Sequence, residues 1–233
     1  MPLEVRAAVA DDAHRVPEME YLAYKDDALS AILFPGPMTA YAREERTRKL
    51  IEQLQSDPLR NRWMKVIDTD RDGEMVAFSN WVVHQEPPAV AVPASEMRTT
   101  TSTTTPAPAP ATRTLGPGCN VAVCEEFWGG MHATRLRNIA GWPHVLLGFL
   151  VTHPSHQRRR AGRKLVDWGL KMADQLQLPA MLNSTPNGHK LYLDCGLRDV
   201  ERSVFDSRKY GGQVVRTTWF MERPVPVSLP STS

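Results

Sequence analysis

Cysteine is scarce in this chain of 233 residues. The three cysteines, Cys119, Cys124 and Cys195, show no C-x-x-C spacing. A small and odd number of cysteines argues against a disulfide framework, and the missing paired spacing argues against a structural zinc site. We therefore expect reduced thiols and no bound metal, as is usual for an intracellular protein.

Long apolar runs are also missing. No stretch approaches the roughly 20 apolar residues that a helix needs to cross a bilayer. The first residues, MPLEV, include an acid and lack the apolar core of a signal peptide. The sequence therefore predicts a soluble, cytoplasmic protein without a membrane partner.

Neither sign of charge dominates, because 28 Lys and Arg residues face 26 Asp and Glu residues, for a formal net charge of +2. Such a balance does not indicate a nucleic-acid partner. The densest basic run is His156–Arg160, and no second basic element supports it as a DNA-binding surface. On its own, a run of this kind can also be a solvated face.

Between residues 87 and 118 the composition changes to Pro, Thr and Ala. Such a segment cannot bury enough apolar surface to offset the entropy lost on ordering, so we expect it to be disordered or extended. Neither flank is complete alone, which makes the segment an insertion within one domain of residues 1–233. A helix is expected just after it, at about 121–138, and we expect this helix to roof part of a substrate pocket.

The rest of the chain alternates between patterns typical of strands and helices. Strands are expected near residues 5–9, 63–67, 75–83, 144–152, 180–183, 200–206 and 214–221, and helices near 16–22, 40–54, 161–176 and 187–195. The order is βααββ, the insertion, then βαβαββ. It predicts an α/β protein with a mixed sheet and helices on both faces.

The chemistry is concentrated where the strand at 144–152 leads through a turn, Gln157–Gly162, into an amphipathic helix. A helix start exposes unpaired N–H groups and the positive end of a dipole, and small residues there let a phosphate approach the backbone. Ala161 and Gly162 are small, and nearby arginines can add charge-assisted hydrogen bonds.

Two sequence runs resemble a known family. Residues 150–165, LVTHPSHQRRRAGRKL, resemble motif A of the GCN5-related N-acetyltransferase (GNAT) superfamily, in which Gln/Arg-x-x-Gly-x-Gly/Ala opens a helix after a strand and a His-Pro turn. Residues 183–197, NSTPNGHKLYLDCGL, resemble motif B. The resemblance covers nearly the whole chain outside residues 87–120. It implies the GNAT fold, with a central twisted mixed sheet, and acetyl-CoA as the co-substrate.

The resemblance also implies roles for individual residues. The strand backbone of Leu150 and Thr152 would pair with the pantetheine arm, and Tyr192 would protonate the departing thiolate unless it is only a core tyrosine. The implied acetyl-CoA contacts are Leu150, Val151, Thr152, Gln157, Arg158, Arg159, Arg160, Ala161, Gly162, Arg163, Asn183, Asn187 and Tyr192. Arg160 stands where the motif has its first glycine, so a left-handed backbone there would carry a penalty of about 1 kcal/mol.

The predicted function is acetylation of a small-molecule amine by direct attack in a ternary complex, by a monomer or homodimer. Two alternatives stay open, a protein lysine or N-terminal acetyltransferase and a non-catalytic acyl-CoA-binding regulatory module. No motif names the base that deprotonates the amine. The candidates are Glu18, Glu20, Asp26, Glu125 and Glu126, and Trp81, Phe127 and Trp128 could line the acceptor pocket.

Overall fold

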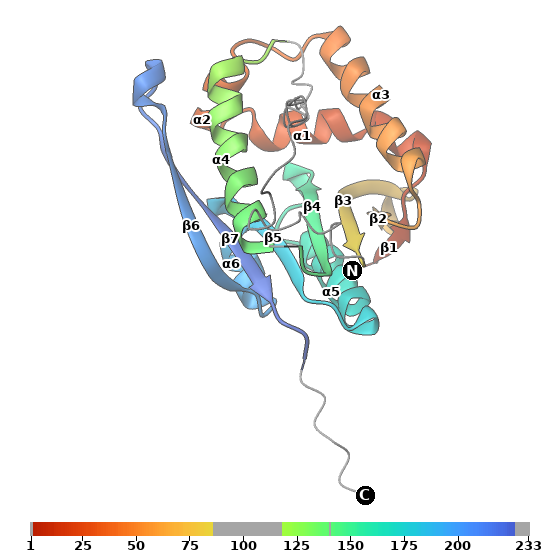
Figure 1. The fold of residues 1–233 in the computed structure, drawn as a ribbon. Coiled ribbons are helices and arrows are strands. Elements are labelled where there is room, and N and C mark those ends of the chain that lie inside the picture. Colours follow the sequence, from red (N-terminus) through yellow and green to blue (C-terminus); the bar gives the residue numbers. More distant parts are fainter. Residues whose placement is uncertain (1, 86–117, 140, 227–233) are drawn as a thin grey trace, which may run out of the picture.

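The computed structural model describes residues 2–85, 118–139 and 141–226 (Figure 1). The strands are β1 (Leu3–Ala7), β2 (Asn61–Asp68), β3 (Glu74–His84), β4 (His144–Thr152), β5 (Ala180–Ser184), β6 (Arg198–Asp206) and β7 (Val215–Arg223). The helices are α1 (Val16–Tyr24), α2 (Ala28–Leu33), α3 (Ala40–Ser56), α4 (Val121–Ile139), α5 (Ala161–Leu176) and α6 (Pro186–Asp194). The described residues also include the 3-10 turns η1 (Ala10–His14), η2 (Thr69–Arg71), η4 (Pro154–His156) and η5 (Ser207–Tyr210).

Two details differ from the sequence-based expectation. The first strand lies at Leu3–Ala7 rather than 5–9, and α2 had not been anticipated. The side chain of Asp27 caps α2 by accepting a hydrogen bond from the N–H of Leu29 at 2.8 Å. This aspartate before the apolar run ALSAIL was a usable signal. The predicted insertion lies outside the described residues except for Gly118, so its disorder stays a prediction.

All seven strands belong to one sheet in the order β1-β2-β3-β4-β5-β7-β6. Every neighbouring pair is antiparallel except β4 and β5, which are parallel. Parallel neighbours need a crossover, and α5 provides it. The expected α/β class with a mixed sheet is confirmed.

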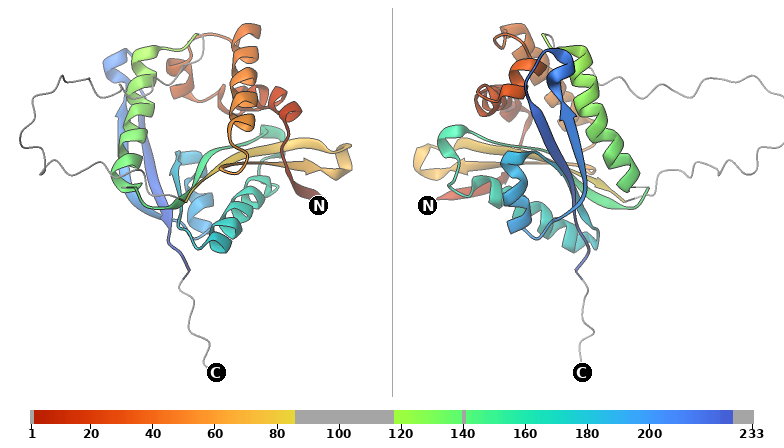
Figure 2. Two further views of the ribbon diagram at one scale, coloured as in Figure 1. Left: turned by 45° about the vertical axis from the view of Figure 1, so that its right-hand side comes forward. Right: turned by 90° about the vertical axis from the view of Figure 1, so that its left-hand side faces the viewer.

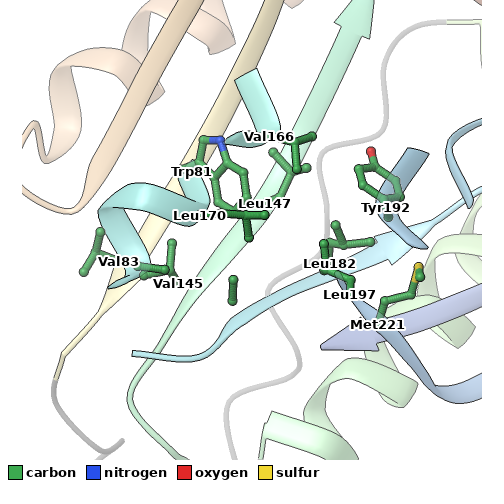
Figure 3. Packing of buried hydrophobic residues seen from close by; sticks show 12 residues of the cluster. Trp81, Val83, Val145, Leu147, Val166, Leu170, Leu182, Tyr192, Leu197 and Met221 are labelled. Atoms are coloured by element: carbon green, nitrogen blue, oxygen red, sulfur yellow. The ribbon is translucent and has the colours of Figure 1, made fainter. Parts of the chain in front are cut away.

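Helices cover both faces of the sheet, as predicted (Figure 2). On one face, Val166 and Leu170 of α5 pack with Trp81, Val145 and Leu147 (Figure 3). Tyr192 of α6 belongs to the same cluster. This face is called the α5 face below.

On the opposite face, called the α1 face below, the sheet is covered by two groups of helices. Phe78 and Val151 pack with Val16 of α1 and Leu50 of α3. Ile139 of α4 packs against a cluster of Leu146, Met181 and Phe220. Neighbouring strand residues point to opposite faces, which explains why Phe78 and Trp81, an odd number of residues apart on β3, join different cores.

One close approach fixes α5 on the sheet. A Cβ added at Gly169 would lie 2.0 Å from Trp81 Cε2, so only glycine lets the helix backbone rest on the indole. Trp81 is fully buried on the α5 face and is therefore a core residue rather than part of a pocket wall. None of the described helices carries an apolar stretch of the length and hydropathy that a bilayer-spanning helix needs.

Candidate active site

Strand β4 changes its surroundings halfway along. From Val145 to Leu147 it pairs with β3 on one side and with β5 on the other. A bulge at Gly148 follows, and beyond it Leu150 and Thr152 pair with β3 alone among the described residues. Because β5 stays with β7, the two parallel strands diverge and leave one edge of β4 open.

At this open edge, the N–H and C=O groups of alternate residues of β4 point away from β3. His153 donates its N–H to Val76 O of β3 at 2.9 Å, so by strand alternation Val151 also bonds toward β3. Leu150 and Thr152 therefore direct their N–H and C=O groups away from β3. Gln157 Nε2 lies 3.5 Å from Thr152 O, consistent with that direction. These are the groups that could pair with an extended amide chain.

The turn between β4 and α5 has an unusual backbone. Arg158 has φ of +60° and Arg160, which precedes α5, has φ of +67° and ψ of 14°. The first main-chain bond of α5 runs from Lys164 N–H to Arg160 O at 3.0 Å. Within the described residues, the N–H groups of residues 158–163 find no acceptor. Left-handed residues followed by a helix start form a concave set of amides that suits an anion.

Because Gly162 has no side chain, the space between this turn, β4 and α6 stays open. A Cβ there would come within 3.3 Å of Thr152 Oγ1, 3.6 Å of Leu150 Cδ2 and 3.6 Å of Leu191 Cδ2 of α6. The glycine therefore lies where the open edge of β4, the start of α5 and α6 converge. A cradle of this shape, lined by free amides, fits the pantetheine and pyrophosphate parts of acetyl-CoA.

The arginines of the turn are not equivalent. Arg159 Nη2 lies 2.7 Å from Asp68 Oδ2 of β2. Arg163 bonds to Asp167 Oδ1 at 2.8 Å and to Asp194 O at 3.0 Å. Arg158 and Arg160 have no ion-pair partner in the described part of the chain. Their side chains are the ones best placed to meet phosphate, whereas Arg159 and Arg163 offer mainly their backbone amides.

Tyr192 lies on α6 with only 8% of its surface exposed. Its ring packs on Gly188, where a Cβ would be 2.7 Å from Tyr192 Cε2. The hydroxyl points away from Leu182, Leu197 and Met221 (Figure 3) and bonds to none of the described residues. Burial raises the pKa of this phenol well above its usual value, with smaller contributions from Tyr24 and Cys195. Tyr192 is thus a protonated phenol at neutral pH.

The two asparagines lie on either side of the turn that begins α6. Asn183 of β5 pairs with Phe220 of β7 and faces the same side as Met181, on the α1 face. Asn187 is exposed in the first turn of α6. In the described ranges neither side chain makes a hydrogen bond, so both are available to a ligand.

On the α1 face, polar groups of α1 and α3 lie beside Phe149 of β4, and of these only Glu20 had been named from the sequence. Arg46 of α3 forms a two-point bond with Glu20 of α1, at 2.9 and 2.6 Å, and its guanidinium lies 5.7 Å from the Phe149 ring centroid. Tyr24, one turn after Glu20, has a pKa raised by burial and then by Glu20 and Asp27. Tyr24 also contributes to the raised pKa of the Tyr192 phenol.

The other candidate bases are less suitably placed. Glu18, Asp26 and Glu125 are exposed to solvent. Glu126 of α4 accepts from the Tyr210 hydroxyl at 2.8 Å and pairs with Lys209, at the tip of the β6–β7 hairpin. Of the five carboxylates, Glu20 is the one whose partner contacts β4.

Helix α4 closes one end of the α1 face. Its Phe127 packs against Phe205 of β6, with ring centroids 5.5 Å apart, in a cluster that includes Leu29 and Leu33 of α2. The ring centroids of Trp128 and Phe34, the residue after α2, are 5.8 Å apart. Phe127 is therefore a core residue, and α4 bridges α2 and the β6–β7 hairpin.

Comparison with known proteins gives limited sequence similarity. No protein-family model matches the chain. The sequence is 30% identical over 77 residues to a protein of Ajellomyces capsulatus named "Probable acyltransferase SID5". That match covers 33% of this chain and 54% of the relative, so it spans about half of the relative's length.

Similarity to solved structures extends over nearly the whole chain. A Corynebacterium glutamicum structure described as histone acetyltransferase HPA2 and related acetyltransferase superposes with a TM-score of 0.57 at 15% identity, covering 100% of both chains. The mosquito arylalkylamine N-acetyltransferase like 5b gives 0.57 at 12% identity, covering 95% of this chain and 99% of that one. Arabidopsis thaliana NAA60 gives 0.55 at 11% identity, covering 97% and 100%. The chain therefore shares the fold of these acetyltransferases, which is the fold that the resemblance to the GCN5-related N-acetyltransferases implied.

Proposed function

We propose that the protein is an acetyl-CoA-dependent N-acetyltransferase whose acceptor is a small-molecule amine. One observation carries the proposal: the open edge of β4 at Leu150 and Thr152 lies against a left-handed turn of free amides, with Gly162 between them. An extended amide arm ending in a pyrophosphate matches both parts of this surface.

Different residues bind different parts of acetyl-CoA in this proposal. Leu150 and Thr152 pair with the pantetheine amides, and the N–H groups of residues 158–163 hold the pyrophosphate at the positive end of α5. Gln157 fixes the turn through Thr152 O. When bound, acetyl-CoA supplies an activated acetyl thioester at the point where β4 and β5 diverge.

Tyr192 serves as the general acid. Its phenol is buried, protonated and free of protein partners, so it can donate to the thiolate that leaves when an amine attacks the thioester carbon. The amine must be neutral to attack. Glu20 is the carboxylate on the α1 face that can take its proton, directly or through water.

The shape of the α1 face supports a small acceptor. Helix α4 joins α2 to the β6–β7 hairpin through a buried cluster, which leaves less room for an extended peptide. Turnover of peptides but not of small amines would instead support a protein lysine or N-terminal acetyltransferase. Binding without turnover would support a regulatory module.

The test combines calorimetry with acetyl-CoA and a thiol-release assay over a panel of amines and peptides. We expect binding and thiol release, and we expect Tyr192→Phe to lower kcat about 100-fold while leaving the Kd for acetyl-CoA unchanged. Tyr41→Phe, on the exposed surface of α3, is the matched control and should behave as wild type. Full activity in Tyr192→Phe would remove the tyrosine from the mechanism.

A further inference from the structure

A buried charged cluster lies behind the phosphate-facing turn. Asp68, at the end of β2, is 1% exposed, and His156 of η4 is 2% exposed. Between them, Arg159 brings Nη2 to 2.7 Å from Asp68 Oδ2 and Nη1 to 2.6 Å from His156 Nδ1. Since a guanidinium only donates, Nδ1 carries no proton. The central residue of the turn is thus anchored to a different part of the sheet.

The cluster is a costly arrangement, because burying a carboxylate is unfavourable unless its partners compensate. The Arg159 guanidinium is the largest cause of a lowered pKa at Asp68, so the carboxyl stays charged. Asp68 Oδ1 is also used, since it accepts from the N–H of Asp70 at 3.3 Å. Both oxygens are therefore committed to fixed partners.

The backbone on either side of Arg159 needs such restraint. Arg158 and Arg160 both have left-handed φ angles, +60° and +67°, which residues other than glycine rarely adopt. Strained conformations persist only where the surrounding structure holds them. The side chain between these two residues is the one tied to Asp68, so the ion pair acts at the centre of the strained segment.

We infer that Asp68 is a positioning residue for cofactor binding, which acts through Arg159 to hold the turn in the shape that presents its amides to a pyrophosphate. This inference rests on the proposed function, because it assumes that the turn binds acetyl-CoA. Asp68 itself touches no ligand in this scheme. Losing it lowers the fraction of molecules whose turn is ready to bind, and the apparent Kd rises by the inverse of that fraction.

The decisive experiment is calorimetry on Asp68→Asn with two ligands, acetyl-CoA and S-acetylpantetheine, which lacks the pyrophosphate. Asparagine keeps the volume but must turn its NH2 group toward either Arg159 or the Asp70 N–H, so one contact is lost. A turn that is ready one-tenth of the time would raise the Kd for acetyl-CoA about tenfold. The Kd for S-acetylpantetheine and kcat at saturation should stay as in wild type.

Asp27→Asn is the matched control. Asp27 also pairs with an arginine, Arg216, at 2.6 Å, and its side chain is 17% exposed, but it lies at the start of α2. This variant should lose stability without changing the Kd for acetyl-CoA. If Asp68→Asn does not fold, Asp68→Asn combined with Arg159→Met removes both charges and serves in its place.

The outcomes separate the two claims. Unchanged affinity for acetyl-CoA in the folded Asp68 variant, or equal losses for both ligands, overturns the positioning role and leaves the proposed function standing. A wild-type protein that binds no acetyl-CoA refutes the proposed function, and this inference falls with it. A selective loss for acetyl-CoA supports both.

Discussion

The two halves of β4 have similar apolar compositions but differ in the strands that pair with them. Val145–Leu147 is paired on both sides, with Val145 and Leu147 packed against α5. Phe149–Thr152 is paired on one side, and its Leu150 and Thr152 lie beside Gly162. The difference arises outside β4, because β5 follows β7 away from it after Leu182. The composition of a strand therefore indicates that it is buried, while its partners decide whether its backbone is available to a ligand.

The largest expected effects come from exchanging the glycines that serve the two halves. Gly162→Val places methyl groups against Thr152 and Leu150 at the open half, and we expect the Kd for acetyl-CoA to rise about 100-fold or more because the backbone can no longer be approached. The loss of stability should be smaller than at Gly169, where an added Cβ would lie 2.0 Å from Trp81. Calorimetry and a melting curve on one sample measure both quantities.

Gly169→Ala is the counterpart at the paired half. Its Cβ would overlap the Trp81 ring, so we expect a loss of about 3 kcal/mol in the free energy of unfolding through overpacking. The surviving folded protein should bind acetyl-CoA as wild type does. If Gly162→Val were the less stable variant and Gly169→Ala the weaker binder, the division of β4 into a structural and a binding half would be wrong.

A smaller effect is expected at Arg160, whose strained backbone lies in the turn that follows the open half of β4. Arg160→Gly suits the left-handed angle, and the relief of about 1 kcal/mol is largely offset by the greater freedom of glycine in the unfolded chain. We expect the Kd for acetyl-CoA to change less than about threefold, since one exposed charge contributes little. Arg160→Val, which resists the left-handed region, should weaken binding more. Equal behaviour of the two variants would show that the backbone angle is unimportant.

The smallest effect concerns pH and the paired half, where His84 and His144 stack with ring centroids 4.3 Å apart. Burial, followed by the charges of His144 and Arg60, lowers the pKa of His84 to about 4. The unfolded chain, with a usual pKa near 6.5, binds more protons between these values, so stability is present above pH 6.5 and is lost as the pH falls toward 4.

Melting curves from pH 7.5 to 4.5 should therefore show a Tm that falls less in His84→Gln than in wild type, by about 3 °C at pH 5. Replacing His14, which is exposed in η1, should not alter the slope. A wild-type slope retained in His84→Gln would assign the pH dependence to other groups, of which buried His156 is the first to test.

Much of the architecture could be predicted from the sequence because it depends on local patterns. The strand at His144–Thr152 lies where an apolar run predicted it, and α3 begins at Ala40, where a helix-forming composition predicted a helix. Helix α2 was missed because six residues are too few for a periodic pattern. The grouping of Glu20, Arg46 and Phe149 was not predicted, although Glu20 had been named as a candidate base, because three distant elements contribute to it.

The sequence by itself determined the order of elements, the cofactor motifs and the position of Tyr192, because each depends on residues close together along the chain. The tertiary structure alone decided that β4 has an open edge, that Arg159 pairs with Asp68 rather than facing solvent, and that Trp81 lies under Gly169. These features depend on which segments meet in space. The local sequence sets the secondary structure and chemistry open to a residue, and tertiary packing determines which contacts that residue makes.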